Sequence, residues 1–223
     1  CRHEVLHTPY DPKCRICVKA KLRHKPRYKV RKLAKSFRNR VHIDSQGPIN
    51  PPDTEGNEYS QTSVHEKSGW VEFTPKSDMT QDMATKIFTK EWCNQEDKLP
   101  SSVKTDGGGE FDLGFTKNAD SLRIKHQRSC PNEPHTNGFV ERRHADSNGA
   151  IRAMLYQGNG LAKLWGKAMK YYAFVYNRAV KASSSGTRTP FEARYGRKYR
   201  GDLPPFLCKV VYKVRDEETK GKF

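Results

Sequence analysis

The sequence predicts an α/β fold in which a mixed sheet is covered by helices. Short segments in which apolar and polar residues alternate are typical of strands, and they recur through the first 125 residues. Longer segments after residue 137 carry apolar residues three or four positions apart, as helices do. The predicted order is three strands, a helix, a strand, a short helix, a strand and two long helices, which is the plan of a mixed sheet.

Five segments are predicted to form the sheet. In the first, Val41 and Ile43 alternate with polar residues, and Gly47 and Pro48 end the strand. The second and third are separated by a turn-like sequence at 66–69, so the first three strands are expected to form an antiparallel meander. The predicted strands span residues 40–44, 59–64, 70–74, 101–105 and 122–125.

Helical spacing marks the remaining segments. Met79, Met83 and Ile87 lie near one face of the first predicted helix. Leu161, Trp165 and the other apolar residues of the last long helix are expected in the core. The predicted helices span residues 79–92, 138–156, 161–182 and 190–193, and a further strand is predicted over 209–214.

The composition excludes some classes of protein. The chain has 223 residues with 42 Lys or Arg and 25 Asp or Glu, which gives a formal charge of +17. This balance is too basic for an ordinary metabolic enzyme. The apolar runs are far shorter than the roughly 20 residues that a membrane span needs, so we expect neither a transmembrane protein nor a membrane partner. The length suits one domain of about 150 residues with an appendage.

The charge is unevenly distributed along the chain. Residues 1–40 carry 14 basic and 2 acidic side chains, residues 41–120 carry 7 and 15, and residues 121–223 carry 21 and 8. Basic flanks favour a polyanion such as nucleic acid, because neutralising phosphates releases counterions. The acidic middle would repel that partner unless its carboxylates bind divalent cations. The alternative is a solvated charged surface.

The cysteines and the N-terminus indicate the cellular context. Six cysteines are present, two of them in a Cys-x-x-Cys, and no signal-peptide pattern precedes them. We therefore expect a protein that is not secreted, with a metal site in preference to a disulfide framework. Because the sequence begins with Cys1, we expect it to be a piece of a longer chain.

Three acidic residues occupy positions where the predicted elements would bring them together. Asp44 ends the first strand, Asp106 follows the fourth, and Glu141 lies in the first turn of a long helix. Clustered carboxylates are tolerable only if they are protonated or bound to cations, and Mg²⁺ and Mn²⁺ prefer such oxygen ligands. Two such ions promote in-line phosphoryl displacement. Singly, each residue also has an ordinary explanation, as a turn residue or a helix-dipole partner.

Four sequence blocks strengthen this interpretation. They are VHIDSQGPI at 41–49, TDGGGEF at 105–111, SCPNEPHTNGFVERR at 129–143 and TPFEARYGRK at 189–198. In this order they resemble the D,D-35-E core of retroviral-type integrases, most closely that of Copia-like LTR retrotransposons. The resemblance covers about residues 41–200 and implies an RNase H-like fold with a mixed five-stranded sheet. The family name gives 35 residues between the last two acids, whereas 34 lie between Asp106 and Glu141.

The resemblance implies residue roles and an activity. Asp44, Asp106 and Glu141 would be the catalytic triad that binds two Mg²⁺ or Mn²⁺ ions, and Asn137 and Gly138 would shape the helix entrance beside DNA. The chain would be a transferase with endonuclease activity that performs 3′-end processing and strand transfer in DNA integration. Its partners would be the element ends and target DNA, and a homo-oligomer is expected. It would act in the nucleus after a cytoplasmic stage in a virus-like particle or pre-integration complex.

Three residues that continue this helix are candidate DNA contacts. Arg142, Arg143 and His144 follow Glu141 directly, so some of them should face phosphates beside the metals. The alternative is surface salt bridging. Within the same fold, the competing function is an RNase H-like endonuclease that uses only water. From another class, the alternative is a domesticated, non-catalytic DNA-binding protein.

The N-terminal segment has the ligand types of a structural zinc site. The ligands would be His3, His7, Cys14 and Cys17, with Cys1 as a possible substitute. The pattern resembles the HHCC module that precedes integrase cores, although only six residues separate its His and Cys pairs. A redox-active or unliganded Cys pair is the alternative.

These features divide the chain into four parts. They are an HHCC-like zinc segment at 1–20, a basic linker at 21–40, the catalytic core at 41–200 and the start of a C-terminal β segment at 201–223. The basic run from Lys19 to Arg40 includes Tyr28 and Phe37, so it could follow a nucleic-acid backbone. It could equally be a connector or a nuclear-import signal.

Overall fold

The computed structural model describes residue 13 and residues 40–93, 99–129, 138–179 and 187–210. The chain divides into two compact units, Cys1–Lys32 and Leu33–Phe223. All described helices and strands belong to the second unit. The predicted zinc segment and most of the linker lie outside the described residues.

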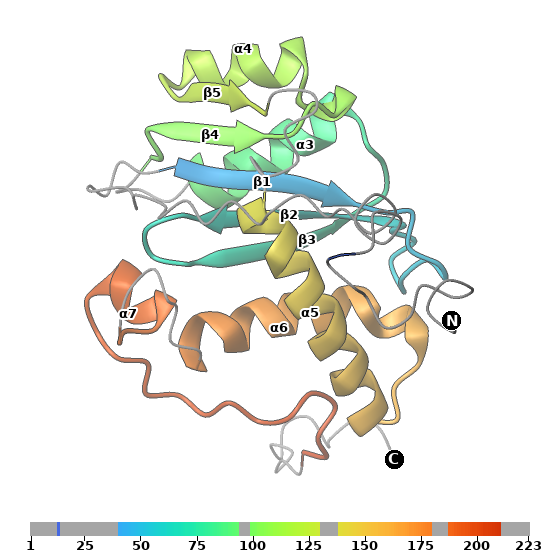
Figure 1. The fold of residues 1–223 in the computed structure, drawn as a ribbon. Coiled ribbons are helices and arrows are strands. Elements are labelled where there is room, and N and C mark those ends of the chain that lie inside the picture. Colours follow the sequence, from blue (N-terminus) through green and yellow to red (C-terminus); the bar gives the residue numbers. More distant parts are fainter. Residues whose placement is uncertain (1–12, 14–39, 94–98, 130–137, 180–186, 211–223) are drawn as a thin grey trace, which may run out of the picture. The chain divides into compact units, whose positions relative to one another are not determined.

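A five-stranded mixed sheet forms the centre of the second unit (Figure 1). Its spatial order is β3-β2-β1-β4-β5. The strands are β1 (Arg40–Gln46), β2 (Tyr59–His65), β3 (Val71–Lys76), β4 (Ser102–Thr105) and β5 (Lys125–Arg128). The first three are antiparallel neighbours, whereas β4 and β5 run parallel to β1. The predicted meander and the predicted mixed sheet are confirmed.

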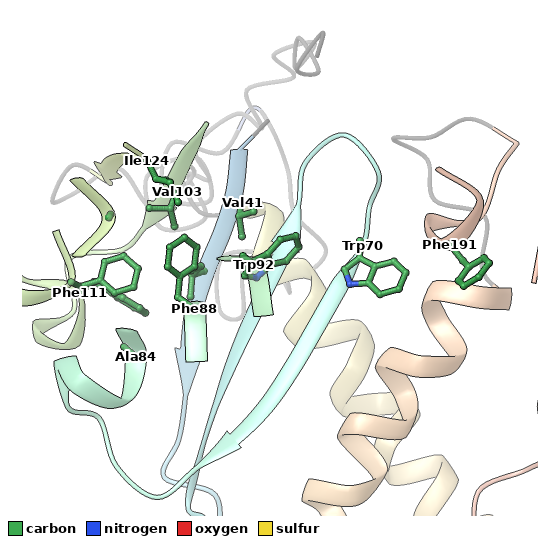
Figure 2. Close-up of a cluster of buried hydrophobic side chains, with 12 residues drawn as sticks. Val41, Trp70, Ala84, Phe88, Trp92, Val103, Phe111, Ile124 and Phe191 are labelled. Atoms are coloured by element: carbon green, nitrogen blue, oxygen red, sulfur yellow. The ribbon is translucent and has the colours of Figure 1, made fainter. Parts of the chain in front are cut away.

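One face of the sheet packs against α3 (Gln81–Phe88) and α4 (Leu113–Ser121). Thr80 begins α3, because its hydroxyl accepts a hydrogen bond from the Met83 N–H. A π-helical turn, Thr89–Cys93, continues the helix and buries Trp92. The core on this face joins aromatic side chains from the helices to aliphatic side chains from the strands (Figure 2). Its buried members are Val41, Ile43, Trp70, Ala84, Phe88, Trp92, Val103, Phe111, Phe115, Ala119, Ile124 and Phe191.

The opposite face packs against α5 (Gly138–Gln157) and α6 (Trp165–Ala179), as Figure 1 shows. Asn177 fixes α6 to the sheet, since its side chain accepts from the Val71 N–H at 2.9 Å and donates to the Val71 carbonyl at 2.8 Å. The buried members of this second core are Val64, Val71, Phe73, Val140, Ile151, Trp165, Ala168, Met169, Tyr172, Ala173 and Tyr176.

The last described helix is α7 (Pro190–Tyr195), which lies next to α6 (Figure 1). Thr189 and Glu192 form a reciprocal capping box at its start. Gly196 ends the helix with φ 70°, a left-handed conformation that glycine adopts without steric cost. The short helix predicted from Pro190 is confirmed.

Two local predictions were wrong, and a third is covered only in part by the described residues. The fifth strand was expected at 122–125 but spans Lys125–Arg128, because α4 runs to Ser121 and a turn with Arg123 at φ 58° follows it. Leu161 was expected in the core but is 73% exposed, since it precedes the 3₁₀ turn Ala162–Leu164 that leads into α6. Residues 209–210 are not in a strand, and 211–214 lie outside the described residues.

A helix that spans a membrane must be both long and apolar. None of the helices in the described ranges is both long and apolar enough to span a bilayer.

Candidate active site

Asp44 and Asp106 lie side by side near the C-terminal ends of two inner strands, β1 and β4. β1 and β4 are parallel neighbours, and the last residues paired between them are His42 and Lys104. Each aspartate lies two residues beyond that pair, so both are on the same face and at the same level. Val41 and Ile43 face α3, and the alternation therefore turns Asp44 toward α5. Asp106 also has the ordinary turn role, since it accepts a hydrogen bond from the Gly108 N–H at 3.0 Å.

Glu141 approaches the same place from α5. It is exposed in the first turn of the helix, which packs against β1 and β2. Burial, together with repulsion from Asp106, Glu141 and Glu110, raises the pKa of Asp44 to about 7, although the Ser45 N–H lowers it. Asp106 and Glu141 therefore each come within electrostatic range of Asp44.

Glu110 is a fourth carboxylate that the sequence argument did not single out. It is 7% exposed, in the 3₁₀ turn Gly109–Phe111 that follows Asp106. A side chain at Gly108 would clash, because its Cβ would lie 2.5 Å from Glu110 Oε2 and 3.1 Å from Asp106 Oδ1. Glycine at this position therefore lets the two carboxylates approach. Glu110 belongs to the TDGGGEF block, which was the signal that could have found it.

Lys76 is a second residue that the sequence argument missed. It ends β3, is 1% exposed, and its Nζ donates to Ser45 Oγ at 2.8 Å. Its electrostatic neighbours are Glu110, Asp78, Asp106 and Asp44. No local pattern marks this lysine, because its position depends on the pairing of three strands.

The three candidate DNA contacts on α5 differ in orientation. Arg142 is exposed. Arg143 is turned inward, with its side chain 15% exposed, its guanidinium 5.1 Å from the Tyr176 ring centroid and an ion pair to Asp146 at 3.3 Å.

His144 faces the acidic cluster. Its Nε2 lies 3.8 Å from Asp44 Oδ2, too far for a hydrogen bond, and has no hydrogen-bond partner in the described part of the chain. Burial lowers the pKa of His144 to about 4, so the ring is neutral at pH 7 and its contact with Asp44 is not an ion pair. Of the three residues, only Arg142 presents a charge to the surface.

The donor set fits a hard divalent cation in its chemistry. Oxygen ligands alone suit Mg²⁺ and Mn²⁺, and a bound cation would remove the repulsion that raises the pKa of Asp44. As they stand, no three His, Cys, Asp or Glu side chains among the described residues are arranged to hold a metal ion. The predicted zinc ligands His3, His7, Cys14 and Cys17, with Cys1, and also Asn137, lie outside those residues. Gly138 begins α5.

A cavity of about 470 Å³ lies between α5 and the segment that follows β1. Gln46, two residues beyond Asp44, lines one side, and Asn148 and Arg152 of α5 line another. Trp165 contributes an apolar wall, held by a 3.0 Å hydrogen bond from its Nε1 to the Pro51 carbonyl. Both polar and apolar side chains therefore line this cavity.

Comparisons with known proteins give the chain a context. No protein-family model matches it. The retrovirus-related Pol polyprotein from transposon TNT 1-94 of Nicotiana tabacum is 27% identical over 145 residues, which are 62% of this chain and 11% of the polyprotein. Part of this chain is homologous to a retrotransposon Pol polyprotein. The matched region is a small fraction of that polyprotein.

Two solved structures share the fold. A chain of the simian T-cell lymphotropic virus intasome in complex with PP2A regulatory subunit B56 gamma has a TM-score of 0.62 and 19% identity, over 91% of this chain and 69% of that one. The catalytic core domain of BIV integrase has a TM-score of 0.52 and 21% identity, over 70% and 92%. The predicted RNase H-like fold of integrase cores is therefore confirmed.

Proposed function

We propose that this chain is the integrase of a Copia-like LTR retrotransposon, a polynucleotidyl transferase that trims the 3′ ends of the element's DNA and joins them to target DNA. One observation carries the proposal: Asp106, Glu141 and Glu110 all act on the partly buried carboxyl of Asp44. This cluster lies at a sheet edge of an integrase-like fold, in a chain homologous to part of a retrotransposon Pol polyprotein.

Each residue of the triad has a role in this proposal. Asp44 and Asp106 would hold one divalent cation, and Asp44 and Glu141 a second. When bound, Mg²⁺ or Mn²⁺ would activate the attacking oxygen and stabilise the leaving oxygen of an in-line displacement. Asp44 is fixed by β1 and Asp106 by the adjoining turn, whereas Glu141 belongs to a separate helix. The spacing of the site would therefore depend on how α5 packs on β1 and β2.

DNA would bind along α5. Arg142 is the exposed cation next to Glu141, and the cavity beside α5 offers the polar side chains of Gln46, Asn148 and Arg152 to a strand. The charge of +17 would supply affinity that does not depend on sequence. Asn137 and Gly138 would shape the helix entrance, and Zn²⁺ would order residues 1–20 through His3, His7, Cys14 and Cys17. The active form would be a homo-oligomer in the nucleus, after a cytoplasmic stage.

A labelled branched DNA that mimics the integration product tests this proposal. The full chain is incubated with it in Mg²⁺, in Mn²⁺ and in chelator, and wild type is compared with Glu141→Gln and with the exposed control Asp120→Asn on α4. We expect a rejoined strand with either metal, and a loss of more than about a hundredfold in Glu141→Gln, since even outer-shell partners of a metal ligand are worth about 10–100-fold. The control should keep its activity.

The other outcomes separate the alternatives. Cleavage without rejoining would identify an RNase H-like endonuclease. DNA binding without a product in either metal would identify a non-catalytic DNA-binding protein. Loss of DNA binding in a folded Glu141→Gln variant would contradict the assigned role of Glu141, because a metal ligand should affect chemistry more than affinity for DNA.

A further inference from the structure

Lys76 is a buried cation beside the acidic cluster. Its side chain is among the largest that are almost completely buried, at 1% exposure. A buried ammonium group is costly unless polar and acidic groups surround it. Here Nζ donates to the hydroxyl of Ser45 at 2.8 Å, and Ser45 directly follows Asp44. The lysine is therefore tied to the backbone segment that carries the central carboxylate.

Lys76 approaches the cluster from the face of the sheet opposite to α5. Ser45 pairs with Gln61, and Gln61 pairs with Thr74, so these three residues share one face. Lys76 lies two positions beyond Thr74 and shares that face, whereas Asp44 points to the other. The lysine thus lies under the carboxylates without competing with Glu141 for their exposed side.

Several acids act on Lys76 at once. Burial lowers its pKa, and Glu110, Asp78, Asp106 and Asp44 oppose that effect, with Glu110 the largest of the four. Glu110 also raises the pKa of Asp44. Lys76 and Glu110 are therefore opposite charges that both act on the same cluster, and each acts on the other.

We propose that Lys76 and Glu110 are two opposing buried charges that set the affinity of the Asp44, Asp106 and Glu141 site for divalent cations. Lys76 is the resident cation that holds the carboxylates together before a metal binds, and its charge opposes metal binding. Glu110 is the counter-charge that favours metal binding. Both are positioning residues, and the inference rests on the proposed function, which makes the triad the cation site.

The sign and size of the effect follow from Coulomb's law. A unit charge about 6 Å from a divalent ion changes its affinity by about tenfold at the dielectric constant of water, about 80, and by more at the lower values that suit protein sites. Removing the charge of Lys76 should therefore tighten metal binding by at least about tenfold. Removing the charge of Glu110 should weaken it by a similar factor.

The test measures Mn²⁺ binding and thermal unfolding of the full chain. Lys76→Met keeps the volume and removes the charge, and Glu110→Gln keeps the shape and removes the opposite charge. Lys86→Met is the matched control, because Lys86 is an exposed lysine on α3. Asp106→Asn identifies which of the measured Mn²⁺ sites is the triad site. Binding is followed by calorimetry, and unfolding with chelator and with Mn²⁺.

The expected results have opposite signs. Lys76→Met should have a lower Tm in chelator, a larger rise of Tm on adding Mn²⁺ and an Mn²⁺ Kd at least about tenfold lower than that of wild type. Glu110→Gln should raise that Kd by about tenfold, the double variant should return toward wild type, and Lys86→Met should not change it.

Two results would overturn the inference. One is a Lys76→Met variant whose Tm falls equally with and without Mn²⁺ while the Kd is unchanged, which would make Lys76 structural only. The other is an unchanged Kd in Glu110→Gln, which decides the matter even if Lys76→Met does not fold. If Asp106→Asn abolishes none of the Mn²⁺ binding that wild type shows, the proposed metal site itself fails. That result is distinct from the two results that would overturn the inference about Lys76 and Glu110.

Discussion

Glu91 shows how the environment of one residue sets its charge. It lies in the π-helical turn after α3, where burial raises its pKa to about 8 and Glu72 adds repulsion. Ser63 donates to its Oε2 at 2.6 Å and Thr74 donates to its Oε1. These hydrogen bonds lower the pKa but do not offset burial. At pH 7 the carboxyl is therefore mostly protonated in the folded protein and ionised in the unfolded chain.

The Glu91→Gln substitution is expected to make the folded protein more stable than wild type at high pH. Because the folded pKa is above the unfolded value, the contribution of Glu91 is complete below about pH 4.5 and is lost as the pH rises through about 8. Glutamine cannot ionise, so the variant should be more stable than wild type by about 2–4 kcal/mol at pH 9 and nearly equal at pH 4.5. Urea unfolding at both values measures this difference.

Glu58→Gln provides the control for this prediction. Glu58 is exposed, so its substitution should change the free energy of unfolding by no more than about 0.5 kcal/mol at either pH. A Glu91→Gln variant that follows the pH dependence of wild type would mean that Glu91 is ionised in the folded protein.

Single residues also show which parts of the site were predictable. Asp44, Asp106 and Glu141 could be proposed from the sequence because each lies in a recognisable block near the end or the start of an element, and the parallel register of β1 with β4 puts the two aspartates side by side. Lys76 was not predictable, since its contact with Ser45 crosses two strand pairings. The inward turn of Arg143 depends on Tyr176 in another helix. Contacts between distant elements leave no periodic pattern.

At the scale of elements, α6 illustrates what periodicity predicts. Its buried residues Trp165, Ala168, Met169, Tyr172 and Tyr176 follow the predicted stripe. The strand β5 illustrates the opposite case, because it is a polar edge strand whose sequence, KHQR, has no apolar alternation. Periodicity reports burial, so elements with one buried face were located and an edge strand without one was misplaced by three residues.

One buried polar side chain contributes to the attachment of α6 to the sheet. Asn177 is 1% exposed and satisfies both the N–H and the carbonyl of Val71, at the start of β3. Asn177→Ala leaves two buried backbone groups without partners, and we expect a loss of about 2–4 kcal/mol in the free energy of unfolding. Asn177→Asp keeps an acceptor for the N–H but cannot donate to the carbonyl. Guanidinium unfolding of both variants measures these losses.

Asn159→Ala is the comparison for this element. Asn159 is exposed, lies beyond the end of α5 and has φ 49°. Alanine is disfavoured in this left-handed conformation, so Asn159→Ala should lower the free energy of unfolding by about 1 kcal/mol through the backbone alone. An Asn177→Ala variant that loses no more stability than Asn159→Ala would show that α6 is held to β3 by apolar packing alone.

At the scale of the whole molecule, the basic residues are concentrated outside the region that builds the candidate site. The middle of the chain is net acidic and contains the strands that build the site, with 7 basic and 15 acidic side chains in residues 41–120. Residues 1–40 carry 14 basic and 2 acidic side chains. If the chain binds DNA as proposed, much of the affinity that depends on salt should come from the basic flanks, because each phosphate they neutralise releases counterions.

Substituting basic residues in the N-terminal flank should therefore weaken DNA binding without loosening the core. The six substitutions to Gln are at Lys19, Lys21, Arg23, Lys25, Arg27 and Lys29. If all six residues contact phosphates, the slope of log K against log salt should become less negative by about 5, at roughly 0.9 per contact. Fluorescence anisotropy from 50 to 300 mM salt measures the slope, and thermal unfolding should be unchanged. Replacing the exposed Lys86 and Lys117 by Gln, on α3 and α4, should leave the slope as in wild type. An unchanged slope in the sixfold variant would assign the phosphate contacts to the surface of α5 instead.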